Sequence, residues 1–298
     1  MDDDQLRAGY DRDIDCGLSS QMGRRRMKRM TAEEIRASFE GNGYFVLENF
    51  MSQKEIDTCE AEIERLHQLG ADFKAKDDPR GHQFQLEPYA KTEKQDGLPV
   101  LRKIEQTGEV SDVFESLSRH PALIDTVRAL LGDDLLLFRS TLMLKPAFHG
   151  SAHAFHQDSA YWPMDPPALV TVSIALTDST TDNGCIQVIP ESHKWGLQEW
   201  GRITRGDGEK MTDREDVDTS SAIEVPLKAG SALMFHSLVA HGSGPNKTAN
   251  ARHTALYAYF PPTVNYRPRP NAPKEKSFAV ISGLEGRREM TLQAAELA

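Results

Sequence analysis

The sequence predicts a mainly β fold with flanking helices and a jelly-roll core. Short apolar or alternating segments recur from Leu135 onward, and glycine, proline and polar turn residues separate them. Segments of this length and spacing favour a β-sandwich or jelly roll over alternating strand and helix units. Helical patterns precede the β-rich region, so we expect the helices to brace one face of the sheets. No period of roughly 20–50 residues repeats, which excludes a solenoid.

Three helices are expected before the β-rich region: one after Thr31, one from Ser52 to Gly70 and one from Pro121 to Leu131. Thr31 and Ser52 each stand three residues before a glutamate, which is the spacing of a capping box. Apolar residues then recur at steps of three and four, as one face of a helix requires. Gly70 and Gly132 are expected to end the second and third helices, and the polar stretch 71–98 predicts an irregular loop.

One strand, YFVLENF, is expected between the first two helices, and further strand segments make up the β-rich region. Those segments are LLLFRSTLML, LVTVSIALT, GCIQVIP, AIEVPL, SALMFHSLVA and HTALYAYF. Turn signals such as Gly230 and Gly244-Pro245 lie between them.

Composition and charge exclude several classes of protein. The 298 residues are 39% hydrophobic and 27% charged, which suits a globular chain with a substantial core. The formal net charge of −10 repels phosphate backbones, so no nucleic-acid partner is expected. No apolar run approaches the roughly 20 residues that span a bilayer, and the N-terminus is acidic, so we expect a cytoplasmic protein without a membrane partner. Three scattered cysteines supply neither a disulfide framework nor a thiolate zinc site.

His156 and Asp158 form the first part of a candidate metal site. Side chains two residues apart project from the same face of a strand, so the imidazole and the carboxylate can converge on one point. Taken alone, the pair is also explained by a surface strand with two polar side chains. His241, 85 residues beyond His156, offers a third ligand, and two histidines with one carboxylate make the facial triad of non-haem iron oxygenases. His236 is a rival on the same apolar segment, but we expect it to face the other way and to pack or meet solvent.

Arg252 follows His241 by eleven residues, and a guanidinium is suited to grip a carboxylate through two hydrogen bonds. With HQD at 156–158, a distal histidine and this arginine, the sequence resembles the phytanoyl-CoA dioxygenase family of Fe(II)- and 2-oxoglutarate-dependent oxygenases. The block DNGCIQVIPESHKWG and the segment GYFVLENF add to the resemblance, which extends from about Thr31 to Phe260. It implies a double-stranded β-helix of the cupin-like type as the core.

The resemblance also implies the roles of individual residues. His156, Asp158 and His241 would ligate Fe(II), and Arg252 would pair with the distal carboxylate of 2-oxoglutarate. Further contacts with this co-substrate are implied for Ser243, Lys103, Gln157 and Thr141.

Several neighbouring residues have more than one explanation. Tyr161 and Trp162, directly after the metal motif, are candidates for a substrate wall, and ordinary core packing explains them about as well. His193 is expected to be a structural histidine, and the polar loop 197–222 has the length of a lid. An aromatic residue that the family places beside the co-substrate falls at Ser173 here, which departs from the pattern.

Family chemistry implies that O2 and 2-oxoglutarate are consumed, that succinate and CO2 are released, and that an unactivated C–H bond of a small molecule is hydroxylated. Asp158 favours hydroxylation over halogenation, because related halogenases replace this carboxylate with a small residue. Desaturation, epoxidation or cyclisation in natural-product biosynthesis is the first alternative. The second alternative is a cupin-type metal-dependent non-oxygenase or a non-enzymatic metal-binding protein. A non-oxygenase does not need Arg252, and a non-enzymatic protein would have lost one of the three metal ligands.

Ligands at 156, 158 and 241 require the β-rich region to close as one body. We therefore expect a disordered leader over 1–30 and one oxygenase domain over 31–298. The domain divides into a helical part, a jelly-roll core and a tail, which cover 31–133, about 134–262 and 263–298. Its partner is expected to be a small molecule, which in this family is an acyl-CoA thioester, an amino acid or osmolyte, a phosphonate or a natural-product intermediate. The chain is expected to be a monomer or homodimer.

Overall fold

The structure is a computed structural model that describes residues 30–295 apart from 89, 91, 93, 96 and 202–216. The leader expected over 1–30 therefore lies outside the described residues except for Met30, and so does the middle of the loop 197–222. From Thr31 onward the chain forms one compact unit. Within the described part, no helix has both the length and the apolar character needed to cross a membrane.

The described residues contain four α-helices, all of them before the long strands. They are α1 (Ala32–Asn42), α2 (Gln53–Ala75), α3 (Asp112–Leu117) and α4 (Pro121–Leu131). Short 3-10 helices are η1 (Pro79–Gln83), η2 (Thr107–Glu109), η3 (Asp158–Ala160), η4 (Ser192–Trp195) and η5 (Leu284–Gly286). Both predicted capping boxes are present, since the Thr31 and Ser52 side chains accept hydrogen bonds from the N–H groups of Glu34 and Glu55.

The prediction that Gly70 ends the second helix is wrong, because α2 continues to Ala75. Gly70 lies inside the helix where the Phe84 ring packs against it, and a Cβ there would come within 2.7 Å of that ring. The missing side chain therefore allows close packing rather than a chain reversal. The irregular loop expected over 71–98 is wrong in part, since it holds the end of α2 and the η1 helix.

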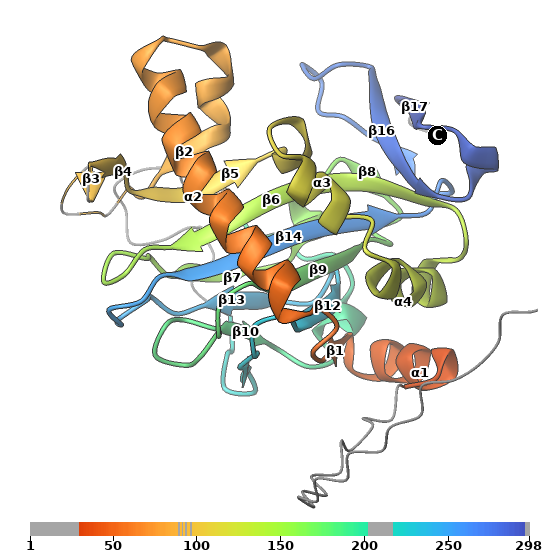
Figure 1. Cartoon of the computed structure of the whole chain (residues 1–298). Coiled ribbons are helices and arrows are strands. Elements are labelled where there is room, and N and C mark those ends of the chain that lie inside the picture. Colours follow the sequence, from red (N-terminus) through yellow and green to blue (C-terminus); the bar gives the residue numbers. More distant parts are fainter. Residues whose placement is uncertain are drawn as a thin grey trace, which may run out of the picture. The chain divides into compact units, whose positions relative to one another are not determined.

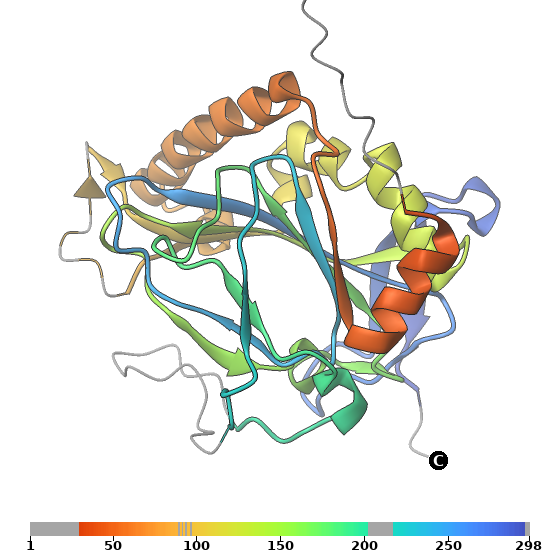
Figure 2. The same ribbon diagram turned by 90° about the horizontal axis from the view of Figure 1, so that it is seen from below.

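Two antiparallel sheets make up the jelly roll, and Figure 2 shows the strands wrapped around a common interior. The large sheet contains β1 (Tyr44–Leu47), β2 (Phe84–Leu86), β5 (Leu101–Glu105), β6 (Leu135–Lys145), β9 (Val170–Ala175), β12 (Ala232–His236), β14 (Arg252–Phe260), β16 (Glu275–Ser282) and β17 (Glu289–Gln293). Its order is β1-β12-β9-β14-β6-β16-β17, with β5 on another part of β6 and β2 on β5.

The small sheet contains β7 (His153–His156), β10 (Ile186–Val188), β11 (Ile223–Val225) and β13 (His241–Ser243), in the order β11-β10-β13-β7. Two further ribbons pair β3 (Lys94–Gln95) with β4 (Leu98–Pro99) and β8 (Met164–Asp165) with β15 (Asn265–Tyr266). The mainly β fold with flanking helices is thus confirmed.

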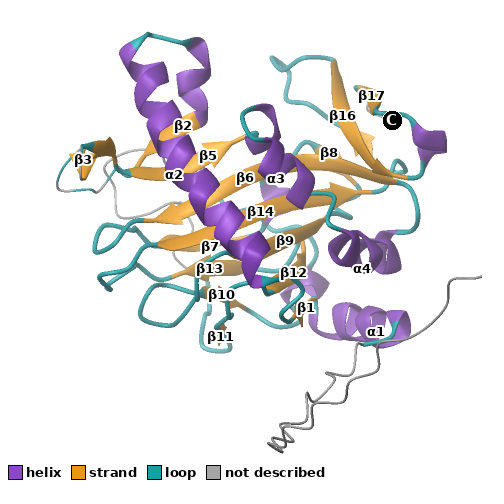
Figure 3. Cartoon of the chain, viewed as in Figure 1, coloured by secondary structure: helices purple, strands orange, loops and turns teal. Residues whose placement is uncertain are grey.

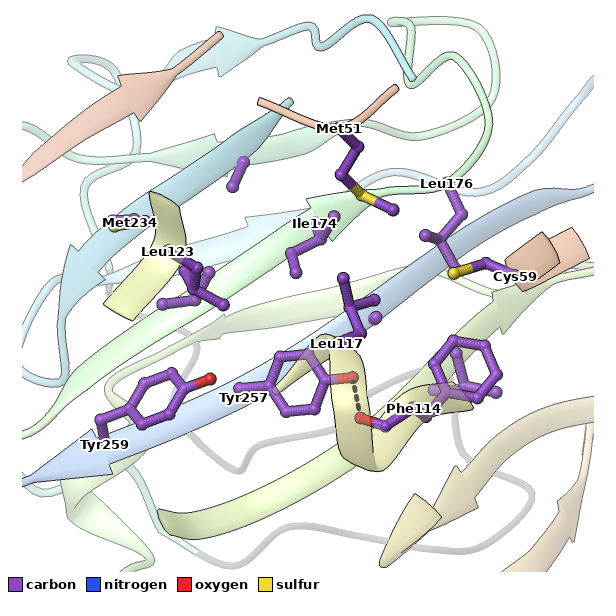
Figure 4. Packing of buried hydrophobic residues seen from close by; sticks show 14 of the residues in the cluster. Met51, Cys59, Phe114, Leu117, Leu123, Ile174, Leu176, Met234, Tyr257 and Tyr259 are labelled. Carbon is purple, nitrogen blue, oxygen red and sulfur yellow. Dashed lines mark hydrogen bonds between the residues drawn. The ribbon is translucent and has the colours of Figure 1, made fainter. Parts of the chain in front are cut away.

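The helices cover the outer face of the large sheet, and the main hydrophobic core lies between them (Figure 1, Figure 3). Leu66, Phe114 and Leu123 from the helices pack in this core with Val172 and Tyr257 from the strands. Figure 4 shows that the Tyr257 hydroxyl donates to the backbone carbonyl of Phe114, at 2.8 Å. The helices therefore brace one face of the sheet, as the sequence predicts.

The expectation of a tail over 263–298 is wrong, because this region adds two strands to the large sheet. β16 pairs with the beginning of β6, and β17 pairs with β16. Phe278 and Val280 are buried with Phe260 in a second hydrophobic cluster. The alternating segment EKSFAVIS carries the signal for a strand, since its apolar residues need a partner surface.

Candidate active site

The inner face of the large sheet is polar although it is buried. Side chains alternate along a strand, so Val172 and Ile174 face the helices while Thr171 and Ser173 face the small sheet. The same alternation places uncharged and charged polar side chains on the inner face of the neighbouring strands. These are Thr141 and Lys145 on β6 and Arg252 and Thr254 on β14. Burial of so many polar groups costs free energy, so a functional site is expected on this face.

His156, Asp158 and His241 converge opposite this polar face. One ligand atom from each residue lies within 4.8 Å of the other two. His156 and His241 are register partners on β7 and β13, and their ring centroids are 4.3 Å apart. Asp158 Oδ1 lies 3.7 Å from Nε2 of His156 and 4.0 Å from Nε2 of His241. The structure thus brings the three predicted ligands together.

Each ligand is oriented by a hydrogen bond on its far side. Nδ1 of His156 donates to the Ala154 carbonyl at 2.9 Å, and Nδ1 of His241 donates to the Val239 carbonyl at 3.0 Å. Because a carbonyl only accepts, these bonds place the proton on Nδ1 and leave the Nε2 lone pairs for a metal. Thr171 Oγ1 donates to Asp158 Oδ2 at 2.7 Å, so Oδ1 is the carboxylate oxygen that faces the histidines.

The protonation states also suit a metal. Burial lowers the pKa of His241 to about 4, so this imidazole is neutral near pH 7. Burial raises the pKa of Asp158, but the neighbouring histidines and the Thr171 hydroxyl outweigh it and lower that pKa to about 2. Two neutral imidazoles and one ionised carboxylate are the donor set of a non-haem Fe(II) triad, so the residues fit the metal.

His241 reaches the site because the chain leaves the large sheet at the end of β12 and enters the small sheet at β13. The sequence predicts one strand over SALMFHSLVA, but β12 ends at His236 and a turn leads into β13 of the small sheet. The Ser237 N–H donates to the Leu169 carbonyl, so the backbone finds partners outside the strand ladder. His236 packs against the Phe39 and His193 rings, which agrees with the prediction that it packs.

Gln157 connects the two ligand-bearing segments. Its Nε2 donates to the carbonyls of Leu238 and Gly196, at 2.7 and 3.0 Å. Its Oε1 accepts from the N–H of Gln198 and from the indole of Trp200, at 2.8 and 3.0 Å. The amide is fully hydrogen-bonded and buried, so the structure directs Gln157 toward the chain behind the site and not toward the predicted co-substrate.

Arg252 and Lys145 form a buried pair of basic side chains on the inner face, where burial and the Arg252 guanidinium lower the pKa of Lys145 well below its ordinary value. They are register partners on β14 and β6, and both are nearly inaccessible to solvent. Lys145 Nζ donates to the carbonyls of Ser151 and Gly244, and Arg252 Nη1 donates to the carbonyl of Gly184. Nε of Arg252 is buried without a hydrogen-bond acceptor among the described residues. Burial lowers the pKa of Arg252 to about 10, so the guanidinium stays charged near pH 7.

The pair of basic side chains fits a carboxylate ligand. In the described part of the chain, no carboxylate forms an ion pair with Arg252 or Lys145, and only backbone carbonyls meet their donors. Buried charges normally have a partner of opposite charge. A bidentate carboxylate would supply it and would give Arg252 Nε its missing acceptor.

The remaining predicted co-substrate residues lie on both sides of the same interior. Ser243 is buried on β13 beside Gly244, whose carbonyl binds Lys145. Thr141 lies on the inner face of β6, where its hydroxyl accepts from Arg139 Nε at 3.1 Å. Lys103 lies on β5 opposite Met143 of β6, and its Nζ forms an ion pair with Glu105 at 2.5 Å.

The two predicted wall residues have different surroundings. The Tyr161 ring lies 6.2 Å from the His156 ring, so it borders the metal ligands. The Trp162 ring packs on Phe138 at 4.9 Å, beside the second hydrophobic cluster. His193 contacts the carbonyl of Glu40 and the His236 ring, away from the triad, so it connects η4 to α1.

Sequence reasoning missed several residues that build the site. Thr171 and Arg139 interrupt apolar segments with a polar side chain, and that interruption is the signal that could have found them. Lys145, the last residue of β6, and Glu105 carry no such signal, because only strand pairing places them beside Arg252 and Arg139.

The fold and the site together define a class: a jelly-roll protein in which two histidines and one carboxylate that could hold a metal ion lie opposite a buried arginine–lysine pair. A family model described as "Phytanoyl-CoA dioxygenase (PhyH)" matches residues 39–254. The chain therefore belongs to the phytanoyl-CoA dioxygenase family of Fe(II)- and 2-oxoglutarate-dependent oxygenases.

Individual relatives agree with this placement. A probable phytanoyl-CoA dioxygenase of Caenorhabditis elegans is 29% identical over 229 residues, which are 74% of this chain and 72% of the relative. An ectoine dioxygenase of Nocardia farcinica is 28% identical over 239 residues, which are 75% of this chain and 76% of the relative. Among solved structures, the apo form of the non-heme monooxygenase ThoJ matches with a TM-score of 0.67 at 26% identity, covering 85% of this chain and 88% of ThoJ.

Proposed function

We propose that this protein is an Fe(II)- and 2-oxoglutarate-dependent dioxygenase that hydroxylates an unactivated C–H bond of a small molecule. The observation that carries the proposal is the pairing of the triad with a second, buried site for a carboxylate on the facing sheet. A metal-dependent hydrolase needs the first feature and not the second. When bound, iron and 2-oxoglutarate supply an oxidant made from O2, and succinate and CO2 are released.

The residues of this chain bind and orient the reactants. His156, Asp158 and His241 would hold the iron. Arg252 would bind the distal carboxylate of 2-oxoglutarate, with Lys145 beside it. Ser243, Lys103 and Thr141 remain proposed contacts of the co-substrate, whereas Gln157 keeps the ligand strands in place.

Asp158 supports hydroxylation as the outcome. Thr171 fixes this carboxylate in position, so Asp158 would serve as the metal ligand that related halogenases lack. Ser173 lies two residues from Thr171 on the same inner face and opposite Leu256, so a small side chain stands where the family has an aromatic one.

An anaerobic titration tests the proposal. Addition of Fe(II) and 2-oxoglutarate to the protein is expected to produce a weak visible charge-transfer band, which His156→Ala abolishes. Lack of a band in the wild-type protein, or an unchanged band in the variant, would refute the assignment. Succinate release is then screened across a panel of small molecules under isotopically labelled O2. A product that gains one labelled oxygen identifies hydroxylation, and a product that loses two hydrogens identifies desaturation.

A further inference from the structure

The interior contains one more charged cluster, formed by Arg139, Glu105 and Lys103. Arg139 Nη2 and Lys103 Nζ both bind Oε1 of Glu105, at 2.9 and 2.5 Å. The side chains of Arg139, Glu105 and Lys103 are 31%, 26% and 15% exposed. The cluster is therefore accessible to solvent, unlike the buried pair formed by Arg252 and Lys145.

Arg139 lies on the same level of the large sheet as the metal carboxylate. Ala258 of β14 pairs with Arg139 on one side and with Thr171 on the other, and Thr171 holds Asp158. Neighbouring strands are about 4.8 Å apart, so the backbones of Arg139 and Thr171 are separated by roughly 10 Å. Arg139 also donates Nε to Thr141, which places its guanidinium on the inner face. The guanidinium therefore lies on the same face of the sheet as Thr171, whose hydroxyl holds Asp158.

One donor of the cluster is unused. Arg139 Nε donates to Thr141 and Nη2 to Glu105, whereas Nη1 has no hydrogen-bond partner among the described residues. Lys276 on β16 is a neighbour of Arg139, and burial and the Arg139 guanidinium lower the pKa of this lysine. An oxyanion is the ligand that such a set of donors binds.

An apolar surface adjoins the cluster. β6 carries an extra residue at Phe138, because Ala258 pairs with Arg139 whereas Tyr259 pairs with Leu137. The half-buried Phe138 ring packs on the half-buried Trp162 ring at 4.9 Å, and Lys276 Nζ lies 5.3 Å from the Phe138 centroid. The anion-binding group thus stands next to an aromatic surface.

We propose that the substrate carries an oxyanion, a carboxylate, sulfate or phosphate group, that Arg139 binds while the apolar part of the substrate lies against Phe138 and Trp162. This inference rests on the proposed function, because it takes the triad as the place where the substrate reacts. Arg139 is a specificity-determining residue in this arrangement. Arg139 adjoins two of the proposed co-substrate contacts, because it donates to Thr141 and shares Glu105 with Lys103, but the ligand assigned to Arg139 itself is the substrate.

Calorimetric titration tests the inference with matched probes. Hydrocinnamate, its primary amide and phenethyl phosphate are titrated into protein that is saturated with Fe(II) and 2-oxoglutarate without O2, so that Arg252 is already occupied. A charge-assisted hydrogen bond predicts that an anionic probe binds about tenfold or more tightly than the amide. Comparison of carboxylate with phosphate identifies the preferred oxyanion. Arg139→Gln is expected to remove the preference, Arg139→Lys to retain part of it, and Arg128→Gln, a surface control on α4, to leave it unchanged.

Several results would overturn the inference. They are equal affinity for the anionic probes and the amide, no binding of any probe to the wild-type protein at millimolar concentration, and a preference that persists in Arg139→Gln. The charge-transfer band of each variant and its unfolding temperature verify that the fold and the metal site are intact. If no band forms in the wild type, the proposed function fails, and the titration is repeated without metal because it measures binding and not turnover.

Discussion

Arg252 and Lys145 face each other across β14 and β6 as two buried basic side chains, and no carboxylate in the described part of the chain forms an ion pair with either. Like charges directly opposite each other on neighbouring strands are destabilising, and burial reduces their screening by water. The folded protein therefore has a buried positive site, and its electrostatic repulsion is relieved when an anion binds there. This relationship leads directly to a prediction about stability.

We predict that 2-oxoglutarate stabilises the protein even without metal. A ligand at 100 times its dissociation constant adds about 2.7 kcal/mol to the free energy of unfolding. Arg252→Met is expected to lose this gain, whereas its own free energy of unfolding without ligand stays within about 1 kcal/mol of the wild type, because an unpaired buried charge is removed. Urea denaturation with and without 2-oxoglutarate measures both effects, with Arg128→Met as the control. Full stabilisation of Arg252→Met would contradict the assignment.

Thr171 is predicted to set the affinity for iron through Asp158. Thr171→Val removes the hydrogen bond to Oδ2 at almost constant volume, and loss of such an outer contact typically weakens metal binding by about 10–100-fold. Thr171→Ser retains the hydroxyl and is expected to bind iron nearly as the wild type does. Anaerobic titration with Fe(II) in the presence of 2-oxoglutarate gives the affinities. Equal affinities for the valine and serine variants would show that the bond has no such effect.

Gln157→Leu separates a structural role from a co-substrate role. The substitution leaves the Leu238 carbonyl and the Trp200 indole buried without their partner, and each unsatisfied group costs about 1–3 kcal/mol. We expect the free energy of unfolding to fall by about 3 kcal/mol or more, while the affinity of the folded protein for 2-oxoglutarate changes less than threefold, or roughly 0.6 kcal/mol. Denaturation and ligand titration are measured on the same preparation. A large loss of affinity without loss of stability would favour direct contact with the co-substrate.

His236 is predicted to make the protein sensitive to acid. Burial, with a smaller contribution from His193, lowers the pKa of His236 from 6.5 to about 4. The unfolded chain then binds more protons than the native protein between these values, so the free energy of unfolding decreases as the pH falls below about 6.5. The decrease reaches about 3 kcal/mol near pH 4 for this residue.

The variant His236→Asn tests whether His236 causes the acid sensitivity. Asparagine removes the titratable ring but retains an acceptor for the Leu238 N–H. The difference in free energy of unfolding between wild type and variant is measured from pH 7 to pH 4, which cancels the contributions of other histidines. We expect this difference to shrink as the pH falls. A constant difference would assign the acid sensitivity to another group.

The sequence reveals the metal centre more completely than the rest of the site. His156 and Asp158 are close in the chain, and their spacing on a strand requires no knowledge of the fold. His241 follows from the family pattern, but its place in the small sheet depends on the turn after His236, which the continuous apolar segment conceals. Ligand type is thus predictable from residues, whereas the route of the chain depends on hydrogen bonds to distant segments.

Residues that act across strands are harder to predict. Lys145 and Arg252 are 107 positions apart, and only the β6–β14 register shows that they are neighbours. Arg139 and Glu105 come together through the β5–β6 pairing in the same way. Gly70 illustrates a local error of a different kind, because a glycine that ends a helix and a glycine that admits an aromatic ring look the same in sequence.

Thr171 and Val172 are adjacent in the chain but point to opposite sides of the large sheet, one toward Asp158 and the other into the helix-covered core. Most of the folding free energy therefore comes from one set of alternate residues, and chemistry depends on the other set. Mutational libraries confined to the inner positions of β6, β9 and β14 can explore new substrates while the core remains intact. For the same reason, a one-residue slip of any of these strands would exchange the two sets and destroy both stability and activity at once.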